Sequence, residues 1–169
     1  YQFVSWGGAI SSTANPVTVT MDSTKSVTAT FTQITPPPTP TALSPGGASE
    51  PGPVIDTLTP ILTWTTVSGA DYYAVAISKY PYGSSNIIYN PQQVSGTSVS
   101  VAIGTLVAGE KYRWNLQAHG PGGLSPVSNT LYFQTKPLPP VIISISPSSV
   151  AASSFQLTIN GTGFDSGAV

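Results

Sequence analysis

The sequence predicts an all-β chain in which one complete β-sandwich lies between two partial β-modules. The clearest signal is a two-residue alternation of apolar side chains, which places Leu62 and Trp64 on one face of a strand. After a Gly-containing turn, the odd-numbered residues of 73–77 lie on one face of the next strand. The same pattern returns at 112–118 and 131–135. β-Branched and aromatic residues in this period are typical of half-buried strands in a small all-β domain.

Composition excludes several function classes before any motif is considered. Charged residues make up 7% of the 169 residues, against roughly 25% in an average soluble domain. The net charge of −1 gives no basic footprint for nucleic acid. No apolar run approaches the ~18 residues that a membrane-spanning helix needs. We therefore expect neither nucleic-acid binding nor membrane insertion.

Polar and turn-forming residues replace the missing charge, including 17 prolines and 16 glycines. This profile is typical of secreted bacterial multidomain proteins, so we expect an extracellular or cell-surface location. The sequence has no cysteine, so its stability must come from a packed core rather than from disulfides. Because the sequence starts in the middle of a pattern, we interpret it as a fragment whose export signal lies upstream.

Residues 1–34 carry the aromatic residues Phe3 and Trp6, followed by two alternating segments at 17–21 and 27–31. A turn-forming cluster separates these segments, which predicts two strands. The order Phe-x-x-Trp-Gly, then Val-x-Met-Asp and Val-Thr-Ala-x-Phe, resembles the C-terminal half of a bacterial surface repeat, the InlB B-repeat-like family. The resemblance covers only that half, so we expect strands that are marginally stable on their own.

Two proline-rich segments, 35–40 and 137–140, flank the central region. Repeated proline favours the extended polyproline II conformation, which rises about 3.1 Å per residue. We interpret both segments as stiff linkers between modules. The proline spacing of the first also suits a ligand of SH3 or WW domains, an alternative that the sequence leaves open.

Between the linkers, several landmarks of one domain family follow each other in the expected order. Trp64 lies in the second predicted strand, and Leu106 is followed six residues later by Tyr112. These features resemble a fibronectin type III domain over about residues 39–136. Ala108 departs from this resemblance, because the family usually has proline at that position. The resemblance implies an immunoglobulin-like sandwich of two packed sheets, with a tyrosine corner at Tyr112.

We expect this domain, residues 41–136, to bury the inward faces of its strands in one core. The predicted core consists of Leu62, Trp64, Tyr73, Val75, Val99, Val101, Leu106, Tyr112, Trp114, Leu116 and Phe133. Its anchors are Trp64, Tyr73, Leu106, Tyr112, Trp114 and Phe133.

Residues 141–169 open a third module. The segments 141–147 and 155–164 are similar to the opening of an IPT/TIG domain. This resemblance implies the first two or three strands of another immunoglobulin-like sandwich.

The residues that carry chemistry are too few and too scattered to predict an enzyme. His119 is the single imidazole, and no G-x-S-x-G motif places a nucleophile beside a base. One histidine without cysteine excludes a zinc site, and a calcium loop needs clustered oxygen ligands. The acidic residues stand singly, at Asp22, Glu50, Asp56, Asp71, Glu110 and Asp165. We therefore expect no catalysis, no metal and no cofactor.

The segment after the third predicted sandwich strand is the one with a binding signal. It carries Tyr80, Tyr82 and Tyr89, and exposed tyrosines stack on sugar faces or anchor protein contacts. In the structural alternative, Tyr80 and Tyr82 cap the edge of the sandwich and Tyr89 packs within the next strand. Exposed, coplanar rings would favour binding.

The sequence as a whole favours a non-catalytic spacer and interaction module of a secreted or cell-surface bacterial multidomain protein. The alternative is a carbohydrate- or protein-binding module that uses the three tyrosines. The expected partners are neighbouring domains of the parent protein, together with a polysaccharide or another surface protein. Such sandwiches host many functions, so the fold alone does not decide between these interpretations.

Overall fold

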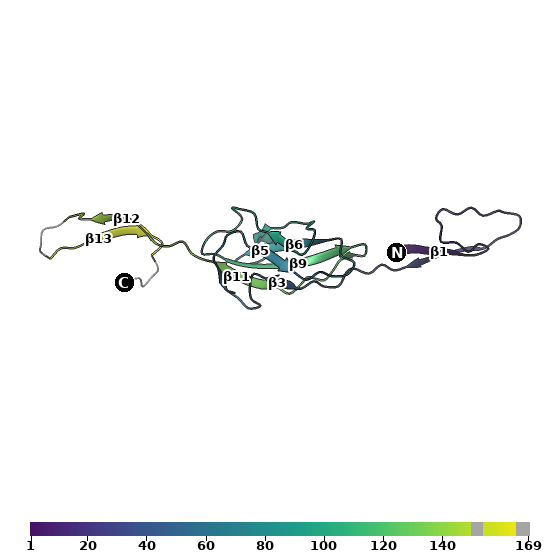
Figure 1. The fold of residues 1–169 in the computed structure, drawn as a ribbon, viewed down its shortest axis with the longest axis horizontal. Coiled ribbons are helices and arrows are strands. Elements are labelled where there is room, and N and C mark those ends of the chain that lie inside the picture. Colours follow the sequence, from purple (N-terminus) through teal and green to yellow (C-terminus); the bar gives the residue numbers. More distant parts are fainter. Residues whose placement is uncertain (150–153, 165–169) are drawn as a thin grey trace.

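The computed structural model describes residues 1–149 and 154–164 and shows three β-units arranged in a row (Figure 1). A hairpin at each end flanks a central sandwich, and the all-β fold class is confirmed. Within the described residues, the single helical element is a 3-10 turn, η1 (Ser84–Asn86). None of the described residues forms a helix that is long and apolar enough to cross a membrane.

The central sandwich consists of two sheets. The smaller sheet has the strand order β3 (Ala42–Ser44), β5 (Ile61–Trp64) and β8 (Ser98–Ser100). The larger sheet has the order β4 (Val54–Ile55), β11 (Leu131–Thr135), β9 (Lys111–Gly120), β6 (Tyr72–Lys79) and β7 (Ile87–Tyr89). A further strand, β10 (Gly123–Leu124), pairs with β9. Only the β11–β4 pair is parallel among the described strand pairs, and the two sheets form an all-β sandwich.

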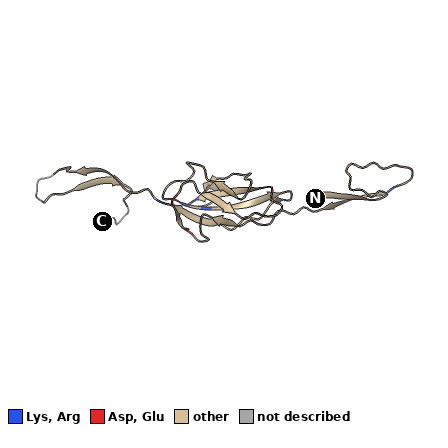
Figure 2. Cartoon of the chain, viewed as in Figure 1, with Lys and Arg blue, Asp and Glu red and all other residues tan. Residues whose placement is uncertain are grey.

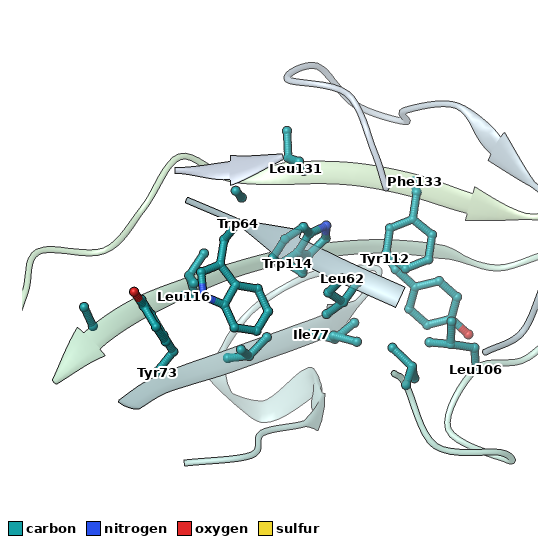
Figure 3. Close-up of a cluster of buried hydrophobic side chains, with 14 residues drawn as sticks. Leu62, Trp64, Tyr73, Ile77, Leu106, Tyr112, Trp114, Leu116, Leu131 and Phe133 are labelled. Atoms are coloured by element: carbon teal, nitrogen blue, oxygen red, sulfur yellow. The ribbon is translucent and has the colours of Figure 1, made fainter. Parts of the chain in front are cut away.

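Side chains from the facing sides of the two sheets form a single core (Figure 3). The alternation is strict on β9, where every second residue from Tyr112 to Ala118 is buried. All six predicted anchors are buried. Val99 differs from the prediction, because it lies on β8, a short outer strand of the smaller sheet, and is only half-buried. The buried hydrophobic core residues beyond the predicted set are Ala42, Ile77, Ala118 and Leu131.

The tyrosine corner closes one end of this core. Tyr112 Oη accepts a hydrogen bond from the Val107 backbone N–H (2.8 Å) and donates one to the Val107 carbonyl oxygen (3.3 Å). Thr135 Oγ1 on β11 donates to the same carbonyl at 2.6 Å. The loop that precedes β9 is therefore fixed to two strands of the larger sheet, and the hydroxyl groups of Tyr112 and Thr135 are satisfied.

The N-terminal hairpin pairs β1 (Gln2–Gly8) with β2 (Val27–Thr32), and Phe3 lies opposite Phe31. The predicted strand at 17–21 is wrong, because this segment lies in the long connection between β1 and β2 and is not assigned to a strand. Its alternation suits a strand, but this segment pairs with neither free edge of the β1–β2 hairpin. Within the connection, Trp6 Nε1 donates a hydrogen bond to the Ala14 carbonyl oxygen at 3.1 Å.

The C-terminal hairpin pairs β12 (Val141–Ser146) with β13 (Thr158–Thr162) in antiparallel register. Every residue of β12 is exposed. Of the predicted module 141–169, residues 150–153 and 165–169, and with them Asp165, lie outside the described residues.

The two proline-rich linkers relate differently to the sandwich. In the first, Pro37 is buried, and its Cγ lies 2.7 Å from where a Cβ on Gly120 would stand. The chain also passes so close to the β9–β10 turn that a Cβ on Gly122 would overlap the Thr35 carbonyl group. Glycine at both positions therefore lets the linker pack against the sandwich. In the second linker, every residue of 136–140 is exposed.

Candidate functional site

Two of the three tyrosines singled out in the sequence lie together at one end of the larger sheet. Tyr80 directly follows β6 and is 53% exposed, whereas Tyr82, in the next loop, is half-buried. Their ring centroids are 5.5 Å apart and the ring planes meet at 89°. The two rings are therefore perpendicular and do not form the flat platform that stacking on a planar sugar face would use.

Tyr82 is the centre of a small aromatic and cationic cluster. Its ring packs edge-on against Tyr132 of β11 at 5.6 Å, and the guanidinium carbon of Arg113 lies 5.0 Å from its centroid. Lys111 Nζ lies 5.7 Å from the centroid of Tyr80. Cations over aromatic faces at these distances are attracted by the ring quadrupole. Burial, followed by the neighbouring Glu50 carboxylate, raises the pKa of Tyr82 to about 12.

Tyr89 has a different environment. It ends β7, is half-buried, and its hydroxyl donates a hydrogen bond to the Ser100 carbonyl oxygen on β8 at 3.1 Å. This bond joins an outer strand of the larger sheet to an outer strand of the smaller one. The three tyrosines therefore do not form one surface, and Tyr89 links the two sheets.

His119 lies at the opposite end of the larger sheet from Tyr82. Its ring stacks on Tyr72, with centroids 4.3 Å apart and planes at 7°. The Nδ1 atom of His119 is buried without a hydrogen-bond partner among the described residues. No group of three or more potential metal ligands occurs in the described part of the chain.

Charged side chains are sparse along the chain (Figure 2). In the sandwich, Lys79 pairs with Glu110 at 2.9 Å, and Lys136 pairs with Asp56 at 3.2 Å. The hydrogen bond that the Lys79 ammonium donates to the Glu110 carboxylate raises the pKa of Lys79. These exposed pairs join neighbouring segments of the sandwich surface.

Sequence reasoning missed two adjoining hollows on the outer face of the larger sheet, with volumes of about 200 and 260 Å³. They are lined in part by Ala74, Ala76, Ile87, Asn90, Asn115 and Gln117. A signal was present: small residues occupy alternate positions of 74–78, and amides alternate with the buried residues of β9. A larger hollow of about 490 Å³ lies beside the second linker, between Ile55, Lys136 and Leu138.

No protein-family model matches the chain, and no curated protein matches it significantly in sequence. Solved structures similar to it include a Fn3-like protein from Clostridium thermocellum, with 24% sequence identity and a TM-score of 0.39. That match covers 62% of this chain and 95% of the other. A second similar structure is a myokine, with 15% identity, a TM-score of 0.42, and coverage of 60% of this chain and 97% of the other.

Proposed function

We propose that the chain is a non-catalytic structural and interaction module of a secreted or cell-surface bacterial multidomain protein. The observation that carries this proposal is the arrangement of three β-units in a row, separated by proline-rich linkers (Figure 1). Such a chain holds neighbouring domains of its parent protein apart. The composition and the InlB B-repeat-like resemblance support the bacterial surface setting.

The first linker gives this arrangement stiffness. Repeated proline favours polyproline II, in which a segment of six residues spans about 19 Å, at about 3.1 Å each. Pro37 and Pro40 are buried, so part of this segment packs on the sandwich instead of crossing free solvent. Because Gly120 and Gly122 allow the close approach, the N-terminal hairpin leaves the sandwich in a defined direction.

A second candidate function, binding of a carbohydrate or another surface protein through tyrosines, is favoured by the Tyr80–Tyr82 cluster. Tyr80 is exposed, and Arg113 lies over the ring of Tyr82. Aromatic rings combined with arginine are common among residues that dominate binding. Tyr82→Ala should abolish retention on an insoluble polysaccharide if this cluster is the binding surface.

Small-angle X-ray scattering of the purified chain tests the spacer role. We expect a monomeric, extended particle whose maximum dimension does not change with protein concentration. Replacing Pro36, Pro37 and Pro38 together with glycine should broaden the distribution of interatomic distances. The same change at Pro137, Pro139 and Pro140 is the matched control for a linker that does not pack on the sandwich. A compact particle, or a distribution unchanged in the first variant, would contradict the spacer role.

A further inference from the structure

We propose that the outer face of the larger sheet binds an uncharged polysaccharide chain in a trough that runs along β6. The two hollows on this face share Ala76, Ile87 and Asn115, so they adjoin each other along β6. The proposal gives the interaction role of the module a ligand and rests on that role. It places the ligand on the strand face and not on the exposed ring of Tyr80.

The floor of the trough is low because β6 carries small side chains on its outer face. Ala74 and Ala76 alternate with the buried residues of the strand and are half-buried. Ala74 pairs with Gln117 and Ala76 pairs with Asn115 on β9. A methyl group next to a long amide side chain leaves a step in the surface, and that step is one wall of the trough.

The opposite wall comes from the other side of β6. Ile87 on β7 lines both hollows, and Asn90 and Gln92 line one of them. Gln92 Nε2 donates a hydrogen bond to Asn90 Oδ1 at 2.5 Å, so the two amides support each other. From Ala74 to Ser78 the floor extends about 13 Å, at about 3.3 Å per residue. That length suits a few consecutive units of an extended chain.

An aromatic group lies at each end of this face. At one end Tyr72 stacks on His119, and at the other Tyr82 packs beside Arg113. These groups are on the same sheet face as the alanines, because Tyr72 and Arg113 occupy outward positions of β6 and β9. These aromatic groups lie outside the lining of the two hollows, so they would flank a bound chain, while the middle offers hydrogen bonds.

The polar groups along the trough suit hydroxyl groups without charge. Each amide of asparagine and glutamine carries both donors and acceptors, as a sugar hydroxyl does. Gln117 Nε2 donates to the Ser125 carbonyl at 2.7 Å, which holds the amide in place. No carboxylate lines either hollow in the described part of the chain. Arg113, the cation at one end, lies beside Tyr82, whose other charged neighbour is Glu50, so the local charges offset each other.

A protein partner is less well matched to this face. The centre of a stable protein interface is formed by large apolar or aromatic anchors, from which water is excluded. Here the exposed large apolar side chains are Ile87 and Leu124, and the rest of the lining consists mainly of small residues and amides. Polar, directional contacts along a narrow depression suit a chain of sugar units.

Native affinity electrophoresis of the full chain tests the proposal. The gels contain one soluble polysaccharide each: hydroxyethyl cellulose, xyloglucan or galactomannan as uncharged probes, and polygalacturonate as the acidic one. The variants are Ala76→Met, which fills the floor with a neutral side chain, and Asn115→Ala, which removes one amide. Ala102→Met makes the same alanine substitution at an exposed loop position and is the matched control. Circular dichroism establishes that each variant is folded.

We expect at least one uncharged polysaccharide to retard the chain, with affinity about tenfold weaker for Ala76→Met and for Asn115→Ala, and unchanged for Ala102→Met. Retardation by polygalacturonate alone, lost on adding salt, would overturn the uncharged ligand class. Binding that survives both trough variants but is lost in Tyr80→Ala would overturn the site. Retardation by none of the probes overturns the proposal and leaves the spacer role, which scattering tests separately.

Discussion

β6 in the central sandwich and β12 in the C-terminal hairpin both consist largely of apolar residues. Only β6 buries these side chains. Tyr73, Val75 and Ile77 are each at most 4% exposed, whereas all six residues of β12 are exposed. The sandwich supplies a second sheet for β6 to pack against, whereas among the described residues β12 has only β13 as a partner. An alternating apolar pattern thus favours a strand, but the strand contributes to a core only where a second sheet packs against it.

The N-terminal hairpin lies between these two extremes. Phe3, Trp6 and Phe31 form a small aromatic cluster. The ring centroid of Phe3 lies 5.1 Å from that of Trp6 and 5.9 Å from that of Phe31. Phe31 nevertheless remains 56% exposed. Aromatic pairs add a modest stabilisation of about 0.5–1.5 kcal/mol, which does not replace a packed sheet. We therefore expect substitutions in the sandwich to have much larger effects than matched substitutions in either hairpin.

The largest effect is expected for Trp114→Ala. Trp114 is fully buried at the centre of the core, and truncation of a buried tryptophan costs about 3–5 kcal/mol. Ile145→Ala on β12, which is 47% exposed, should change the free energy of unfolding of the sandwich by no more than about 0.5 kcal/mol. Urea unfolding followed by circular dichroism measures both. Similar losses in the two variants would show that the hairpin contributes to the same cooperative unit.

A second pair of substitutions compares the same kind of hydrogen bond in a buried and an exposed setting. Trp114 Nε1 donates to the Pro45 carbonyl oxygen at 2.7 Å, and Trp6 Nε1 donates to the Ala14 carbonyl oxygen at 3.1 Å. Trp114→Phe leaves the Pro45 oxygen without its donor and should cost about 1–3 kcal/mol. Trp6→Phe should cost less, because water can reach the Ala14 oxygen. Amide hydrogen exchange in β9 and in β1 reports the two losses, and equal losses would contradict the role given to burial.

The strands and the anchors of the core were accessible from the sequence because their signals are local. On β9, Tyr112, Trp114 and Leu116 alternate with polar residues, and all three are buried. The spacing from Leu106 to Tyr112 likewise indicates a corner, whose hydrogen bonds to Val107 are present. A two-residue period needs no knowledge of which strand is the partner.

The local sequence pattern does not show which strands pair with each other. Residues 17–21 alternate as well as 27–31 do, but only the second segment pairs with β1. The environment of Tyr82 was equally out of reach, because Arg113 and Tyr132 come from strands that the fold brings to its loop. For the same reason, the two hollows along β6 depend on β7 and β9 lying on either side of it.

The packing of the first linker gives a third prediction, on how the units are joined. Gly122→Ala introduces a Cβ that overlaps the backbone of Thr35, so the linker should separate from the β9–β10 turn. We expect faster proteolysis within residues 33–39 and a broader scattering profile, with little change in the unfolding of the sandwich. Gly7→Ala, where a Cβ meets nothing within 4 Å, is the control. An unchanged rate of cleavage in Gly122→Ala would show that the linker does not depend on this contact.

The smallest effect on stability is expected for Tyr82, in the loop after β6. It tests whether the packing of the sandwich extends to this surface loop. The folded state holds the proton of Tyr82 more tightly, since its pKa is raised from 10.0 to about 12. Between these two values the unfolded chain loses this proton while the folded chain keeps it. The contribution of Tyr82 to stability is therefore fully present below pH 10 and is lost as the pH rises through about 12.

Tyr82→Phe removes this group, so the decline in stability between pH 10 and about 12 should be shallower in the variant than in the unsubstituted chain. The comparison of the two chains at each pH cancels the titration of lysines and of the other tyrosines. Urea midpoints measured across this range give the difference. Parallel declines would show that the Tyr82 ring is solvated in solution, and that the sandwich, like the hairpins, leaves this part of its aromatic surface unpacked.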